Sequence, residues 1–374
     1  NSNPLESLDV TSCTSLQVLD CGSCSLSRLD LSQAPALTYL DCSNNSLTGL
    51  DLSNNARLET LSVQQNGLTA IDLSALQDLT YLIISKNALG TLDLSKNLKL
   101  KNLQADEIGL TRIDLSANKQ LELLHLAQNK LQTFSLESLT LKELYINDNN
   151  LTSLELKSPS LELLCAYANQ LTDIDLTNLP NLNTISLHSN TLSTIDLSRA
   201  TKLEYLWVQN NKLSALDLSS SPSLLTLECY RNALDEGATF SLVNTLPDQD
   251  PSLGATLIIV NNPIVDKNSC SKDAVAKAKA KGWGVYDLNE EKSGYPGLPY
   301  EGKETANEWV DNPKAFIIQT HDAIYPNAPF DQAVVYLYDS VGNLLLKGAP
   351  NRPISTALLP SGVYHIVILS EDQV

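Results

Sequence analysis

The chain has 374 residues and a formal net charge of −18, and these two numbers already exclude several classes of partner. Binding to nucleic acid needs Lys and Arg to neutralise phosphates, so a chain this acidic is not expected to bind it. The same charge opposes binding to an anionic membrane surface. No apolar run reaches the roughly 18–20 residues that a helix needs to span a bilayer. The composition instead fits a self-repelling protein of the extracellular type.

A unit of 20 or 21 residues occurs about eleven times along the chain. Each copy begins with a Leu, and the leading residues are Leu16, Leu37, Leu58, Leu79, Leu100, Leu121, Leu141, Leu161, Leu182, Leu203 and Leu224. The third position after the leading Leu is again Leu, except at Ile185. Alternation over the first six residues predicts a short strand with one buried face. Because one strand cannot bury that face alone, the copies are expected to stack into a solenoid.

A conserved polar position within the repeat follows each predicted strand. Asn occupies the eighth position after the leading Leu in nine copies, namely Asn45, Asn66, Asn87, Asn129, Asn149, Asn169, Asn190, Asn211 and Asn232. An Asn side chain bonds backbone groups in turns and supports left-handed backbone there, so stacked copies predict an Asn ladder inside the coil. The second half of each copy is also strand-like. We therefore expect extended structure on both sides, which makes the solenoid thin and gently curved.

The pattern L-x-x-L-x-L-x-x-N resembles the leucine-rich repeat, and the resemblance covers roughly residues 5–262. It implies a leucine-rich-repeat solenoid, mainly β, with strands on its concave side and a binding surface rather than an active site. We expect a partial repeat at 1–15 and the regular solenoid, with a degenerate last copy, at 16–262. The sequence has no nucleophile elbow, phosphate loop or H-E-x-x-H motif, so no enzyme activity and no cofactor are expected.

The Cys residues are best explained by their places in the repeat. Cys21, Cys42 and Cys229 take inward positions that hold Leu, Val or Ile elsewhere, so we interpret them as buried hydrophobic residues. Cys24 takes the position of the ladder Asn. The spacing Cys21-Gly-Ser-Cys24 is therefore not interpreted as a zinc site. Cys165 takes an outward position near two His residues, but no third group is present to orient a nucleophilic pair.

A column of acidic residues marks the fourteenth position, from Asp30 to Asp217, interrupted only by Ser135. Carboxylates stacked at strand spacing are one arrangement that binds calcium. Each Asp, however, stands in a Leu/Ile-Asp-Leu-Ser or closely similar context, where it can accept hydrogen bonds from its own turn. We favour the local role, and no metal is expected.

Regularity fades after the eleventh copy. A last strand is predicted at 255–260, a helix at 271–281 that ends at Gly282, and a closing strand at 283–288. Residues 263–288 are therefore expected to form a C-terminal cap over the edge of the core. Residues 289–313 are rich in Gly, Pro, Glu and Asn, which predicts a linker.

Residues 314–374 predict a small all-β sandwich, with strands at 315–320, 333–338, 344–347, 354–359 and 363–369. Three stretches occur in order: Ile-Tyr-Pro-Asn at 324–327, Val-Tyr-Leu-Tyr-Asp-Ser-Val-Gly-Asn at 335–343, and Leu-Pro-Ser-Gly-Val-Tyr-His-Ile-Val at 359–367. Together they resemble the C-terminal sorting domain of the type IX secretion system of Bacteroidota. The resemblance implies a bacterial protein located outside the cell or on its outer surface. A plain spacer or adhesion module is the alternative.

Aromatic residues gather on the outward positions of the predicted strands. All six Tyr of residues 16–234, the one Trp and both His lie at the second, fourth or sixth position after a leading Leu. They are densest on five consecutive copies, with two Glu beside them. We call this candidate site the aromatic strip; it consists of Glu143, Tyr145, Tyr167, His188, Tyr205, Trp207, Glu228 and Tyr230. Exposed Tyr and Trp are typical of protein-binding hot spots and also stack on sugars.

These features favour a secreted or cell-surface recognition or adhesion protein that binds a protein partner, from a host or a neighbouring cell, through its concave face. A glycan-binding module on the same face is the second hypothesis. A structural spacer without a specific ligand is the third, because aromatic residues also suit an open sheet face that binds nothing.

Overall fold

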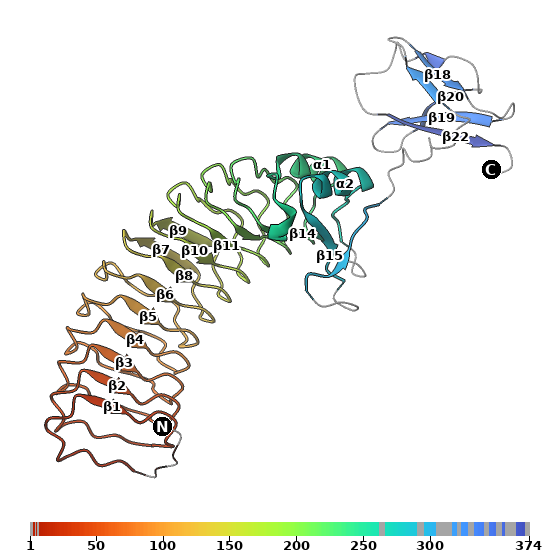
Figure 1. Ribbon diagram of the computed structural model, residues 1–374. Coiled ribbons are helices and arrows are strands. Elements are labelled where there is room, and N and C mark those ends of the chain that lie inside the picture. The colour runs from red at the N-terminus through yellow and green to blue at the C-terminus, as the bar shows by residue number, and fades with distance from the viewer. Residues whose placement is uncertain are drawn as a thin grey trace. The chain divides into compact units, whose positions relative to one another are not determined.

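The computed structural model describes residues 3, 5, 7–261, 266–289 and 295–303, together with the backbone of strands at 316–319, 323–327, 333–339, 344–348, 354–355 and 364–370. The chain divides into two compact units, Asn1–Lys303 and Glu304–Val374. The first unit is a coil whose turns follow one another along an open arc (Figure 1). In the described residues, no helix is long and apolar enough to cross a bilayer.

One parallel sheet runs along this coil, with one three-residue strand from each repeat. These strands are β1 (Val18–Asp20), β2 (Tyr39–Asp41), β3 (Thr60–Ser62), β4 (Tyr81–Ile83), β5 (Asn102–Gln104), β6 (Leu123–His125), β8 (Glu143–Tyr145), β10 (Leu163–Cys165), β11 (Thr184–Ser186), β12 (Tyr205–Trp207) and β13 (Thr226–Glu228). Equivalent repeat positions pair with one another, as Leu19 does with Leu40. This register brings every third-position side chain into one continuous core.

The core confirms the repeat as read from the sequence. From the second copy onward, each leading Leu and each third-position residue is fully buried. Burial of one such side chain stabilises a fold by about 1.5–3 kcal/mol. Cys21, Cys42 and Cys229 are buried among them, as predicted. The hydrophobic effect therefore acts along the whole coil rather than at one centre, as expected for stacked repeats.

The predicted Asn ladder is present. At Asn149, Nδ2 donates to the carbonyls of Leu126 at 2.9 Å and Ile146 at 3.1 Å, and Oδ1 accepts from the Leu131 N–H at 3.0 Å. Equivalent bonds recur at the other eight ladder Asn. The residue before the Asn is left-handed, as at Asp148 with φ 54°. Each side chain thus fastens its own turn to the preceding one.

The second half of the repeat differs from the prediction. Paired strands occur there only in the two 20-residue copies, as β7 (Thr133–Glu137) and β9 (Ser153–Lys157), which form a separate two-stranded sheet. In the 21-residue copies an Asp turns the chain instead, because its carboxylate accepts the N–H two residues later. Asp93 Oδ1, for example, accepts from the Ser95 N–H at 2.9 Å. The 20-residue copies hold Ser135 and Glu155 at this position, so their strands continue.

The predicted cap at 263–288 is preceded by two short helices that were not predicted, in the range expected to hold a degenerate last repeat. The expected helix is α2 (Lys272–Ala280), with Ser271 as N-cap, and the expected strands are β14 (Thr256–Val260) and β15 (Gly284–Asp287). The additional elements are α1 (Glu236–Thr245) and the 3-10 helix η1 (Pro251–Leu253). The N-cap of α1 is Asp235, which accepts from the Ala238 N–H at 2.8 Å.

The last rung of the ladder also comes from the cap. Asn268 Nδ2 donates to the carbonyls of Cys229 at 2.8 Å and Ile259 at 2.9 Å, and its Oδ1 accepts from the Leu234 N–H at 3.1 Å. An Asn from outside the regular repeat therefore satisfies the backbone of the final turn, where the core would otherwise end on open polar groups.

Part of the segment expected to be a linker packs against the cap. Strand β16 (Leu298–Pro299) pairs antiparallel with β15. Tyr300 packs on the hydrophobic core, and its hydroxyl donates to the Cys270 carbonyl at 3.3 Å. The linker prediction of 289–313 is therefore wrong for residues 298–303, and residues 290–294 and 304–313 lie outside the described part.

The second unit is all-β in its described residues. One antiparallel sheet contains β17 (Phe316–Gln319), β18 (Ala323–Asn327) and β21 (Ile354–Ser355). The other contains β19 (Ala333–Asp339), β20 (Leu344–Gly348) and β22 (Tyr364–Ser370). Five of these strands coincide with predicted ones, and β18 holds the Ile-Tyr-Pro-Asn stretch. Residues 340–343 and 359–363 of the other two stretches lie outside the described residues.

Candidate binding face

The main sheet directs the first and third residues of each strand outward and buries the one between them, although the third residue is buried as well in β3, β11 and β13. In β12, Tyr205 and Trp207 are half-buried, whereas Leu206 between them is fully buried. Because the register is repeated, outward side chains of neighbouring strands lie in rows across the coil. The rows bring the ring-bearing residues of the aromatic strip into three clusters.

The first cluster joins two neighbouring strands at β6 and β8. The rings of His125 and Tyr145 lie with centroids 4.2 Å apart and planes inclined at 32°. The Tyr145 hydroxyl donates to Glu143 Oε2 at 3.2 Å. Burial, the Glu143 charge and this hydrogen bond raise the pKa of Tyr145 to about 12. Tyr145 is therefore a neutral donor at physiological pH, and Glu143 accepts from it.

The second cluster is a stacked pair from the eighth and ninth repeats. Tyr167 and His188 lie 4.3 Å apart with planes inclined at 10°. Burial lowers the pKa of His188, and the nearby charge of Asp148 partly opposes that shift. Burial and Asp148 raise the pKa of Tyr167. Both rings are therefore uncharged at neutral pH and present a flat surface with polar edges.

The third cluster surrounds a buried carboxylate. The Tyr205 and Trp207 rings lie parallel within 10°, with centroids 5.9 Å apart. The Trp207 indole N–H donates to Glu228 Oε1 at 3.0 Å, and the Gln209 amide donates to Oε2 at 3.2 Å. Burial raises the pKa of Glu228, while its hydrogen bonds from Trp207 and Tyr295 oppose the shift. These bonds fix the orientation of the Trp207 ring.

The exposure predicted for the strip is wrong at its C-terminal end. Glu228 is 6% exposed and Tyr230 is 7% exposed. Tyr295, from the segment that returns over the cap, bonds Glu228, and the Arg231 guanidinium lies 5.8 Å from the centre of the Tyr230 ring. The contact between Glu228 and Tyr295 joins the last repeat to a residue outside it, so repeat register did not indicate this contact. The accessible part of the strip is Glu143, Tyr145, Tyr167, His188, Tyr205 and Trp207.

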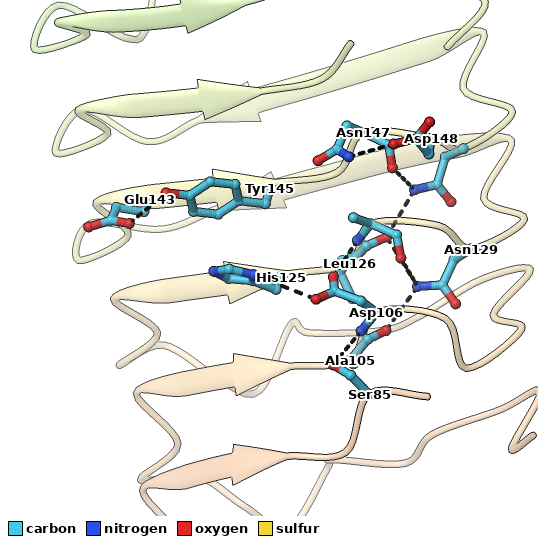
Figure 2. A network of polar contacts seen from close by, with 12 residues as sticks. Ser85, Ala105, Asp106, His125, Leu126, Asn129, Glu143, Tyr145, Asn147 and Asp148 are labelled. Carbon is cyan, nitrogen blue, oxygen red and sulfur yellow. Dashed lines mark hydrogen bonds and ion pairs between the residues drawn. The ribbon is translucent and has the colours of Figure 1, made fainter. Parts of the chain in front are cut away.

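The face also extends further toward the N-terminus than the strip. Figure 2 shows the His125 and Tyr145 rings one above the other, with Glu143 at one end and Asp106 at the other. Asp106 Oδ2 lies 3.6 Å from His125 Nδ1, and Asp106 Oδ1 accepts from the Ala127 N–H at 2.7 Å. Asp106 takes the sixth, outward position of its repeat, so repeat register alone was a sufficient signal to include it.

The groups considered for chemistry are held in inactive forms. Burial and the Glu143 charge raise the pKa of the Cys165 thiol to about 11, so it is not a thiolate at neutral pH. Burial raises the pKa of Cys21 to about 12, with Cys24 and nearby Asp residues adding to the shift. Among the described residues, no three His, Cys, Asp or Glu side chains gather as a metal site.

The acidic column makes the local hydrogen bonds expected of it. At Asp30, Asp51, Asp93, Asp114, Asp196 and Asp217, the pKa is lowered first by the backbone N–H of the Ser two residues later and then by its hydroxyl. At Asp72 the Ser74 hydroxyl contributes most, and at Asp175 the Thr177 hydroxyl does. These carboxylates therefore stabilise turns.

Comparison with known proteins agrees with this architecture. The sequence matches the model of the family described as Leucine Rich Repeat over residues 36–56, and no curated protein matches. The leucine-rich repeat domain of APL1B superposes with a TM-score of 0.61 at 20% identity, over 79% of this chain and 96% of that one.

Two bacterial structures are also similar. A leucine-rich-repeat protein of Leptospira interrogans gives a TM-score of 0.56 at 22% identity, over 76% of this chain and 82% of that one. An internalin, InlF, from Listeria monocytogenes gives 0.50 at 21% identity, over 68% and 81%. Together with the L-x-x-L-x-L-x-x-N register and the Asn ladder, these likenesses establish that the first unit of the chain has the leucine-rich-repeat fold.

Proposed function

We propose that the chain is a secreted or cell-surface recognition protein that binds a protein partner through the aromatic strip. The observation that carries the proposal is the row of ring clusters on one face of a continuous sheet. Tyr and Trp supply large contact areas with few side-chain torsions to immobilise, which suits them to interfaces. The clusters occupy consecutive repeats, so one partner can contact them together.

Local geometry supports the assignment of binding, rather than sheet cover, to these rings. The strand residues between the outward positions are already fully buried, so the core does not need the rings for shielding. The Tyr145 hydroxyl and the Trp207 indole are held by Glu143 and Glu228. Such bonds orient rings before a partner arrives and reduce the entropy lost on binding.

The test compares ring removal inside and outside the strip. A triple variant replaces Tyr167, Tyr205 and Trp207 by Ala, and a control variant replaces Tyr39 and Tyr81, which lie on the same sheet face at β2 and β4. Both are screened against an array of purified extracellular proteins, beside the unaltered chain. We expect partners of the unaltered chain to bind the control within about threefold and the triple variant at least about tenfold more weakly. Equal binding by all three would refute the strip as the site.

A glycan ligand is the second candidate, favoured by the parallel rings of Tyr205 and Trp207. Two parallel rings can stack on the faces of sugar rings, and polar groups at the edges of the aromatic rings can form hydrogen bonds with the sugar. A glycan array probed with the same three proteins separates the candidates. Binding to a sugar that the triple variant loses, without any protein partner, would replace the protein-binding proposal by this one.

We further propose that the second unit is a bacterial sorting tail of the type IX kind, supported by the three ordered sequence stretches in residues 324–367. Residues 304–374 fused to a fluorescent reporter are expressed in a Bacteroidota strain with and without a working type IX system. We expect the reporter outside the cell only where the type IX system works. Deletion of 314–374 from the full chain should trap that chain in the cell envelope. Retention of the reporter in both strains would contradict the proposal and favour a spacer or adhesion module.

A further inference from the structure

We propose that the partner presents a basic segment, whose Lys or Arg side chains dock between Asp106 and Glu143 over the His125–Tyr145 ring pair. This inference rests on the proposed function and adds the chemistry of the partner. It concerns the N-terminal end of the binding face, where repeats five to seven meet, and its occupant is identified by charge complementarity.

The outward positions of the main sheet carry acidic side chains and no basic ones. The second, fourth and sixth positions of the eleven repeats contain no Lys or Arg, although the chain has 25 of them. The same positions contain five acidic residues, which are Asp20, Asp41, Asp106, Glu143 and Glu228. A sheet face that only needed solubility would carry both signs. The exclusion of basic residues therefore makes this face complementary to a cation.

The basic residues near the His125–Tyr145 ring pair form ion pairs elsewhere. Lys101 and Lys142 stand at the first repeat position, beside the strands, and both lie near Glu122. Lys101 Nζ is 3.4 Å from Glu122 Oε1, and Lys142 Nζ is 4.0 Å from Glu122 Oε2. Glu122 thus engages both lysines at the edge of the sheet. Neither Asp106 nor Glu143 forms an ion pair with a Lys or Arg of the described residues, so no Lys or Arg of the chain neutralises these two carboxylates.

The carboxylates of Asp106 and Glu143 are held by short contacts at the two ends of the ring pair. Glu143 accepts from the hydroxyl of Tyr145, a neutral donor, and Asp106 accepts from a backbone N–H and approaches His125. The side chains of Asp106 and His125 are 26% and 27% exposed, so both remain reachable. Figure 2 shows the ring pair spanning the space between the two acids.

This combination suits Lys and Arg side chains in particular. A guanidinium or ammonium group is attracted both to a carboxylate and to the face of an aromatic ring. Arg can use both at once, because its planar group stacks on the ring while its N–H groups point to the acid. A segment with basic residues two apart, in extended conformation, would place successive charges along the strip and its apolar parts on the remaining rings.

The test measures how tightly a cationic peptide binds two variants. Each variant loses two negative charges through isosteric substitutions, one on the sheet face and the other in the acidic column. The face variant is Asp106→Asn with Glu143→Gln, and both changes keep the acceptor oxygens that hold Ala127 and Tyr145. The matched control is Asp72→Asn with Asp93→Asn, which removes the same net charge from the acidic column. The probe is a Lys-Ser repeat peptide of about twelve residues, measured with the full chain at about 0.15 M salt, with a Glu-Ser peptide as the reversed-charge control.

We expect the face variant to bind the Lys-Ser peptide about tenfold more weakly than the unaltered chain, and the column variant to differ by less than about twofold. Equal losses in both variants would indicate attraction to the net charge alone and would overturn the inference, as would no binding by the unaltered chain. If the triple variant loses a partner in the protein array while the face variant and the column variant keep it, the proposed function stands and the basic segment is refuted.

Discussion

The two sides of the coil use carboxylates in different ways. In the acidic column, Asp93 accepts the N–H of Ser95 within its own turn, and the repeat reproduces that bond nearly every 21 residues. On the sheet face, Glu143 instead accepts from the Tyr145 ring hydroxyl, and no regular repeat of that bond occurs among the described residues. The periodic acids therefore stabilise the turns of the coil, whereas the aperiodic acid Glu143 lies beside aromatic rings on the face where we propose that a partner binds.

The largest effect on stability is expected at the Asn ladder, which belongs neither to the sheet face nor to the acidic column. Asn149→Ala leaves the carbonyls of Leu126 and Ile146 and the N–H of Leu131 without this side chain as a partner, in a buried setting. We expect the free energy of unfolding to fall by about 3 kcal/mol in urea titration. Asn147→Ala, two positions earlier and outside the ladder, is the control and should cost less. Similar losses in the two variants would contradict the structural role of the ladder.

The acidic column should contribute to the loss of stability of the protein at low pH. Local hydrogen bonds lower the pKa of its Asp residues below the ordinary value of 3.8, so their stabilisation is complete above that pH and is lost as the pH falls through the lowered values. A variant with Asn at positions 51, 72, 93 and 114 should melt with a smaller dependence on pH between about 4 and 2. Unchanged dependence would mean that these bonds contribute nothing to folding.

A smaller effect is expected at Glu228, where the sheet face meets the cap. Burial raises the pKa of this carboxyl above 4.5, and the Tyr295 hydrogen bond opposes the rise. Tyr295→Phe should therefore raise the pKa further, which fluorescence of Trp207 reports because its indole N–H donates to Glu228. Trp207→Phe identifies the signal of that ring. A lower pKa in the Phe variant would show that Tyr295 does not bond Glu228 in solution.

The smallest effect is expected at the second ring cluster. Burial lowers the pKa of His188 from 6.5, and the charge of Asp148 raises it in part. Asp148→Asn should therefore lower the His188 pKa further, as measured by NMR titration of the ring protons. Because the neutral ring is favoured in the folded state, its contribution to stability is present above pH 6.5 and falls as the pH drops through the folded value. A rise in the pKa would contradict the assigned geometry.

Sequence analysis succeeded for the core, the ladder and the outward strand positions, which repeat register sets directly. The buried Leu rows, the ladder at Asn149 and the outward position of Tyr205 all follow from register, since stacking makes each position equivalent in every copy. The helix α2 was also predictable, because Ser271 and Gly282 mark its ends. These features depend on local pattern and a single periodic contact.

One failure lies within the repeat, where the 21-residue copies turn at an Asp instead of forming the strand predicted for their second half. The other failures lie where residues outside the repeat act on it. Glu228 is bonded by Tyr295, which no periodicity connects to the last repeat, and Tyr230 in the same repeat is 7% exposed. Helix α1 was missed because its interior holds Gly237, Thr239 and Ser241, which are weak helix formers. Contacts with the cap and the Asp235 N-cap decide its conformation instead.

We propose that the accessible strip, with Asp106 and His125 beside it, contacts the partner, and this contact can be measured directly. Hydroxyl-radical footprinting of the full chain, alone and saturated with a partner from the protein array, measures the exposure of individual Tyr and Trp side chains. The account predicts protection of Tyr145, Tyr167 and Trp207, with oxidation of Tyr39 and Tyr81 unchanged. Unchanged oxidation of Tyr145, Tyr167 and Trp207, with protection only elsewhere on the coil, would contradict it.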